Sequence, residues 1–117
     1  MAQRSRNRFT GLIILTAIVW TAVLSHHAAA QSVDIAAGRK RAEVCMACHG
    51  EKGFAVDPGI PNLAGQDQEY LEKALKAYRG AQLRQDPTMT EMAKPLTDAD
   101  IANLAAFWHS LPGKSSQ

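Results

Sequence analysis

The sequence predicts an all-α domain built from three main helices and two long irregular segments. Apolar residues recur with the 3.6-residue period of a helix at 68–79 and again at 97–111. Glycine and proline gather at 50–65, which excludes a regular helix or strand there, and they break any long helix at 81–95. No part of residues 31–117 shows the two-residue alternation of a strand. The expected domain is therefore purely helical, with two loops long enough to serve a functional site.

The first helix is expected to begin at Asp34 or Ser32, since either side chain can cap a helix N-terminus. Gly38 lies inside this helix, where glycine costs about 1 kcal/mol relative to alanine. Such a cost is tolerated where a second element crosses closely. Gly38 therefore indicates either a close crossing by another element or simple tolerance of the cost, and we expect the crossing.

The second and third helices carry clear start signals. Asp67 or Gln66 is the expected N-cap of the helix at 68–79, and Gly80 is its expected end. Thr97 is the expected N-cap of the last helix, because a threonine followed by acidic residues suits the positive end of the helix dipole.

Residues 1–30 have the pattern of a secretory signal peptide. A basic start is followed by an apolar run at 11–24 and by three alanines that end at Ala30. We expect cleavage after Ala30, export to the periplasm, and a mature domain of residues 31–117 without a membrane span. An uncleaved membrane anchor remains the alternative, because no Asp, Glu, Lys or Arg interrupts residues 9–30. The apolar run is, however, shorter than the roughly 20 residues of a membrane span.

Both cysteines of the chain lie in one motif, Cys45-x-x-Cys48-His49. This spacing is the attachment signature of c-type haem, in which each thiol forms a thioether with one porphyrin vinyl group. The adjacent His49 then supplies the proximal imidazole to the iron. A thioredoxin-like redox pair would need a βαβ context, and a zinc site would need a second pair of ligands. The motif therefore predicts one covalent haem c.

The second axial ligand has four candidates among residues 31–117. Met46 lies inside the attachment turn on the proximal side, which excludes it. His109 lies on the last helix beside the buried stripe, where a lone histidine is more often packed or exposed than a ligand. Met89 and Met92 lie in the segment 81–95, from which a thioether can reach the iron. The residues alone leave the choice between these two methionines open.

Five motifs carry a resemblance to a known family. They are Cys45-x-x-Cys48-His49-Gly50, Pro61-Asn62-Leu63-Ala64-Gly65-Gln66, Tyr70-Leu71, Met89-x-x-Met92 and Leu96-Thr97-Asp98-x-Asp100-Ile101-Ala102-x-Leu104-Ala105-Ala106-Phe107. Together they resemble a class I cytochrome c of the small bacterial periplasmic monohaem type, similar to one half of the two-haem bacterial cytochromes c. The resemblance covers residues 34–111. It implies the class I cytochrome c fold, with helices and loops wrapped around one covalently bound haem.

The resemblance also implies roles for individual residues on the proximal side. Cys45 and Cys48 carry the thioethers, and His49 is the proximal ligand of the iron. Pro61 occupies the position of the family proline, whose carbonyl accepts the ring N–H of the proximal histidine and fixes the imidazole. Leu63 is expected to pack on the haem.

On the distal side, Met89 matches the family's axial methionine, judged by its spacing to Leu96. Met92 matches a second methionine that does not bind the iron. Gly38 and Phe107 match the family's crossing of the first and last helices. The resemblance therefore predicts an iron held by His49 and Met89.

The function implied by the resemblance is periplasmic electron transfer by a low-spin His/Met haem. The protein is accordingly expected not to be an enzyme. The expected partners are redox proteins, namely a reductase and an oxidase or dehydrogenase. The protein is expected to be a monomer or to form transient complexes with them. The formal net charge of the full chain is +2, and loss of the basic leader leaves a near-neutral domain. Nucleic-acid binding is therefore not indicated. Three alternatives stay open: a haem subunit of a periplasmic dehydrogenase complex, a haem enzyme or gas sensor with a labile axial methionine, and a haem-free thiol–disulfide protein.

Overall fold

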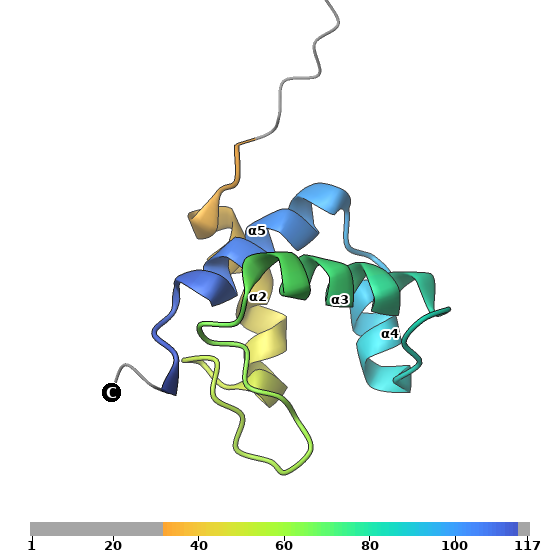
Figure 1. The fold of residues 1–117 in the computed structure, drawn as a ribbon, viewed down its shortest axis with the longest axis horizontal. Coiled ribbons are helices and arrows are strands. Elements are labelled where there is room, and N and C mark those ends of the chain that lie inside the picture. The colour runs from red at the N-terminus through yellow and green to blue at the C-terminus, as the bar shows by residue number, and fades with distance from the viewer. Residues whose placement is uncertain (1–31, 115–117) are drawn as a thin grey trace, which may run out of the picture. The chain divides into compact units, whose positions relative to one another are not determined.

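The computed structural model describes residues 32–114, and the predicted signal peptide at 1–30 lies outside the described residues. The described chain contains four helices and no strand (Figure 1). In chain order they are α2 (Ile35–His49), α3 (Gln68–Gly80), α4 (Pro87–Ala93) and α5 (Asp98–Ser110). The all-α prediction is confirmed. Across residues 32–114, none of the helices has both the length and the apolar character needed to cross a membrane.

The predicted helix starts are confirmed, and the structure decides between the alternatives. The Asp34 side chain caps α2 by accepting a hydrogen bond from the Ala37 N–H at 3.0 Å. The Asp67 side chain caps α3 in the same way. At α5, Thr97 and Asp100 form a capping box in which each side chain accepts from the other residue's N–H. Three of the four helices therefore begin at an N-cap that the sequence predicts.

The prediction that residues 81–95 contain no regular element is wrong for Pro87–Ala93, which forms α4. Proline at the first position of a helix loses no hydrogen bond, because that N–H has no partner inside the helix. The Asp86 side chain caps this start by accepting from the Met89 N–H at 2.8 Å. Pro87 thus begins a short helix instead of breaking one.

The end of α3 also differs in detail from the sequence prediction. Gly80 is the last helical residue, and the left-handed position that ends the helix is taken by Ala81, with φ of 52°. The Ala81 N–H donates to the Tyr78 carbonyl at 3.1 Å. A side chain at positive φ is strained, because its Cβ crowds the backbone.

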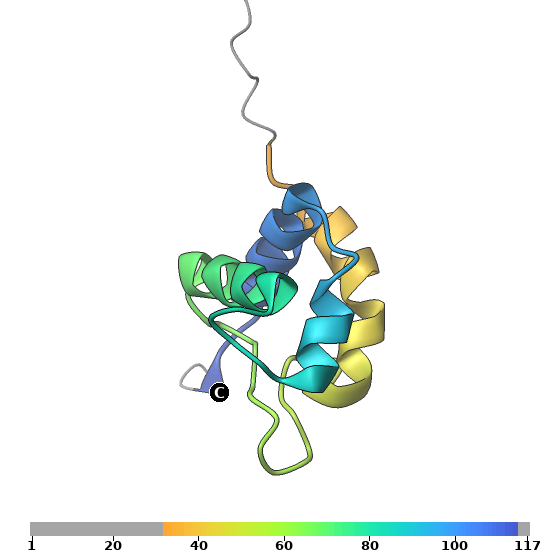
Figure 2. The ribbon, with the colours of Figure 1, turned by 90° about the vertical axis from the view of Figure 1, so that its right-hand side faces the viewer.

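Helix α5 forms the centre of the domain. Its buried residues are Ile101, Leu104, Ala105, Ala106, Phe107 and Trp108. Helices α2 and α3 both pack against α5, and α4 packs against α3 (Figures 1 and 2).

The crossing of α2 and α5 depends on Gly38. A Cβ placed there would overlap the backbone of Asn103 and lie 3.0 Å from the Cβ of Phe107. The predicted close crossing at Gly38 is confirmed. This contact fixes the helix that ends in the cysteine motif against the centre of the domain.

Candidate functional site

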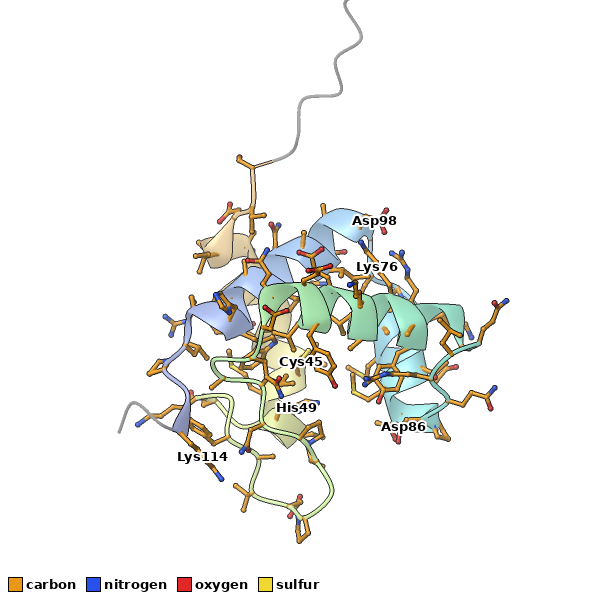
Figure 3. All side chains as sticks on the ribbon, viewed as in Figure 1. Cys45, His49, Lys76, Asp86, Asp98 and Lys114 are labelled. Atoms are coloured by element: carbon orange, nitrogen blue, oxygen red, sulfur yellow. The ribbon has the colours of Figure 1, made fainter. Side chains whose placement is uncertain are left out.

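The cysteine motif occupies the C-terminal turn of α2 (Figure 3). Cys45 is half-buried, Cys48 is exposed, and His49 is buried with 5% of its surface exposed. Gly50 ends the helix with φ of 83°, a value that glycine adopts without strain, and its N–H donates to the Met46 carbonyl at 2.9 Å. The helix therefore turns away directly after His49 and leaves the imidazole at its end.

The imidazole of His49 is held by the backbone of the following loop. Its Nδ1 donates a hydrogen bond to the Pro61 carbonyl at 2.8 Å. This is the contact that the family resemblance implies for Pro61. Because Nδ1 carries the proton, Nε2 keeps its lone pair and can bind a metal.

The position of Pro61 depends on a hydrogen-bonded loop that the sequence did not reveal. The Gly53 carbonyl accepts from the N–H groups of Leu63 and Ala64, at 2.9 and 3.2 Å. The Asn62 side chain accepts from the Ala55 N–H at 2.9 Å. Gly53 is buried with φ of 76°, and a Cβ there would overlap Ala64. The glycines at 50–65 indicated an irregular loop, but the sequence did not predict which groups of the loop form hydrogen bonds with one another.

A cavity of about 300 Å³ lies between α2, α3 and α4. Its lining is mostly apolar and consists of Arg41, Val44, Cys45, Leu75, Met89, Glu91, Met92, Ala93, Pro95 and Leu96. Within the described chain, α2 and α4 do not pack against each other. The two helices instead contribute residues to the same cavity, Cys45 from α2 and the two methionines from α4.

The structure brings both candidate methionines to the cavity. Met89 and Met92 are half-buried and lie three residues apart in α4, so both project from one face of that helix. Leu63 is half-buried and packs against the core, and it is not among the residues that line the cavity.

The other two candidate ligands lie elsewhere. His109 is exposed on α5, and its Nδ1 donates to the Gln66 carbonyl at 2.7 Å. Met46 packs from α2 against the core.

The surroundings of Cys45 do not favour a reactive thiolate at that residue. Burial raises the pKa of the Cys45 thiol, and the nearby Arg41 lowers it by a smaller amount. Reactive cysteines of thiol–disulfide enzymes have depressed pKa values that favour the thiolate. Cys45 therefore lacks the property on which the haem-free thiol–disulfide alternative depends.

These residues fit a c-type haem. The Cys45 thiol and the thioethers of Met89 and Met92 line one mostly apolar cavity, and the buried imidazole of His49 lies one helical turn after Cys45 with its Nδ1 held by Pro61. Imidazole and thioether are the axial ligand types of cytochromes c. An iron with a protein ligand on each side, surrounded by apolar residues, would be a redox centre shielded from water.

Residues 35–112 match the family model described as cytochrome c. The chain belongs to the cytochrome c family. Its haem c is accordingly covalently bound through Cys45 and Cys48, and it carries one iron.

Individual relatives agree with this assignment. Cytochrome c-554(548) of Halomonas halodenitrificans is 46% identical over 79 residues, which cover 66% of this chain and 95% of that protein. Cytochrome c4 of Thiocapsa roseopersicina is 45% identical over 89 residues, which cover 74% of this chain and 45% of that protein. The chain therefore spans less than half of the length of that cytochrome c4.

Two solved structures have a similar fold. Reduced recombinant cytochrome c4 from Pseudomonas stutzeri superposes with a TM-score of 0.67 at 35% identity, covering 71% of this chain and 48% of that one. Thiosulfate dehydrogenase from Marichromatium purpuratum superposes with a TM-score of 0.64 at 33% identity, covering 70% of this chain and 20% of that one.

Proposed function

We propose that this cytochrome c is a periplasmic electron carrier whose iron is held low-spin by His49 and Met89. The observation that carries the proposal is the cavity between α2 and α4, which is lined by Cys45 of the cysteine motif from α2 and by Met89 and Met92 from α4. With a protein ligand on each axial position, no substrate can reach the iron directly. That arrangement suits electron transfer better than catalysis.

Each part of the site has a task in electron transfer. The haem iron supplies a one-electron couple between the ferric and ferrous states. Pro61 holds the imidazole of His49 in one orientation, which reduces the rearrangement that accompanies a change of charge. The neutral, soft thioether of Met89 favours the ferrous state and raises the reduction potential. The mostly apolar lining of the cavity would disfavour water beside Met89 once the haem is bound.

The proposed location and partners rest on the leader pattern and on the cytochrome c family of the chain. The signal-peptide pattern at 1–30 supports a periplasmic location. A carrier there would exchange electrons with a reductase and with an oxidase or dehydrogenase, and would act as a monomer in transient complexes. Weak, short-lived complexes are typical of redox partners, whose interfaces are small.

A second candidate is a haem subunit that stays bound to a dehydrogenase. The similarity to the thiosulfate dehydrogenase structure favours this candidate. The matching region makes up a fifth of that chain, so a similar domain there is part of a larger protein. Gel filtration of a native extract separates the two. A free carrier elutes near the mass of the monomer, and a subunit elutes with its dehydrogenase.

The visible spectrum in both redox states tests the proposal. A low-spin spectrum with the weak far-red band of ferric Met–S ligation is expected. A high-spin ferric spectrum would instead favour a haem enzyme or gas sensor with an open axial position.

A further inference from the structure

Arg79 joins the end of α3 to the segment that connects α4 with α5. Its Nη1 donates a hydrogen bond to the Leu96 carbonyl at 2.9 Å, and its Nη2 donates to Asp98 Oδ1 at 2.6 Å. The partners lie 17 and 19 residues away along the chain. One guanidinium therefore binds α3 to Leu96 in the α4–α5 connection and to Asp98, the first residue of α5. Figure 3 shows Asp98 at the start of α5, above the C-terminal half of α3 that also carries Lys76.

The fastened segment is continuous with α4. The Leu96 N–H donates to the carbonyl of Ala93, the last residue of α4, at 3.0 Å. Leu96 is buried, with 8% of its surface exposed, and lines the cavity together with Met89 and Met92. The hydrogen bonds of Arg79 therefore act on the wall that presents the methionines.

Helix α4 has few other attachments. It has seven residues, and helices of this length are not stable alone in water. Within the described chain α3 is the one helix whose backbone lies close to that of α4, and the buried Ala93 is the residue by which α4 joins the core. Its ion pair between Lys94 and Glu91 is local to its own end. The position of α4 over the cavity therefore depends on what holds it to α3.

From this geometry we infer that Arg79 is a positioning residue for the axial methionine: it holds α4 against α3, so that losing it frees the iron's second axial position. The inference rests on the proposed function, because it takes Met89 as the ligand. The two hydrogen bonds of Arg79 are expected to contribute unequally to the position of α4. Asp98 is exposed, so its ion pair with Arg79 contributes little by itself. The Leu96 carbonyl belongs to a buried residue, and a buried acceptor left without a donor is costly.

The test measures imidazole binding to the ferric, haem-containing protein. Imidazole competes with the methionine, so its apparent affinity rises with the fraction of molecules in which α4 has moved away. Arg79→Met removes both hydrogen bonds, and we expect imidazole affinity to rise about tenfold. Arg79→Lys keeps one donor and should fall between Arg79→Met and the unaltered protein. Asp98→Asn keeps the bond to Leu96 and should change imidazole affinity less than twofold.

Lys73→Met is the matched control. It removes a cation from the same helix, where Lys73 pairs with Glu69, another residue of α3, at 2.6 Å. If Arg79→Met binds imidazole no better than Lys73→Met, the inference is overturned. Should Arg79→Met fail to fold, Arg79→Lys and the same control decide the question on the same scale.

The failure of this inference differs from the failure of the proposed function. If Met89→Ala binds imidazole much more tightly than the unaltered protein and Arg79→Met does not, Met89 is the ligand and Arg79 does not position it. If Met89→Ala leaves both the far-red band and imidazole affinity unchanged, the ligand assignment itself is wrong and the inference falls with it.

Discussion

The Nδ1 atom of His49 donates a hydrogen bond to the Pro61 carbonyl over 2.8 Å, joining the end of α2 to a loop residue twelve positions away. The bond fixes both the orientation of the ring and the tautomer that leaves Nε2 free. The position of Pro61 is in turn supported by the next residue, because the Asn62 side chain accepts a hydrogen bond from the Ala55 N–H. The orientation of the His49 ring therefore depends on the glycine-rich loop that follows α2.

Asn62→Ala is expected to destabilise the protein by about 1 kcal/mol, because the half-buried Ala55 N–H loses its acceptor. A looser Pro61 also orients and polarises His49 less well, so we expect a higher reduction potential. Urea unfolding and a redox titration measure the two effects. An unchanged potential in a destabilised variant would show that the loop supports the fold without tuning the iron.

Gly38→Ala is expected to destabilise the protein by about 2–3 kcal/mol, because the added methyl overlaps the backbone of Asn103 at a tightly packed crossing. Gly80→Ala is the matched control. It lies at the last position of α3, and nothing stands within 4 Å of an added Cβ. There the better helix propensity of alanine should leave stability equal or slightly higher. Thermal unfolding of both variants checks the contrast, and similar losses would contradict the crossing.

Ala81→Gly is expected to stabilise the protein by about 0.5 kcal/mol. The φ of 52° at Ala81 strains an alanine but not a glycine, and the greater freedom of glycine in the unfolded chain offsets part of the gain. Denaturant unfolding measures the difference. A loss of stability would mean that the left-handed turn costs alanine nothing at this position.

Two carboxylates of the first turn of α5 link stability to pH. The hydrogen bond from Arg79 lowers the pKa of Asp98 from its ordinary 3.8, and the Thr97 N–H lowers the pKa of Asp100. A depressed folded-state pKa stabilises the protein above about pH 3.8, and that contribution is lost as pH falls through the lower folded value.

Asp100→Asn should therefore be less stable than the unaltered protein at neutral pH, and the two should converge in strong acid. Urea midpoints at a series of pH values follow the difference. A difference that stays constant down to the lowest pH would contradict the assignment, because it would not depend on the charge of Asp100.

The sequence predicted the elements whose signals are local. The caps at Asp34, Asp67 and Thr97 were readable because each side chain bonds to a backbone group within three residues. Helix α4 was not predicted because a proline such as Pro87 can have either of two effects. It breaks a helix when it lies in the interior, and it favours a helix when it lies at the first position. The single residue Asp86 in front of it decides between them.

The site divides in the same way. The haem motif and the contact of His49 with Pro61 were accessible from a five-residue pattern and a family resemblance. The two hydrogen bonds of Arg79 were not, because they join groups 17 and 19 residues apart that no local pattern relates. Met89 and Met92 share one helix face, so the assignment of Met89 remains a prediction.

The far-red absorption band of the ferric protein tests the central claim most directly when it is recorded for two single variants. Met89 and Met92 line the same cavity from the same helix, so each variant is the control for the other. The account predicts that the band disappears in Met89→Ala and persists in Met92→Ala. A band that survives in Met89→Ala and disappears in Met92→Ala would move the ligand to Met92, and its absence from the unaltered protein would contradict His/Met ligation altogether.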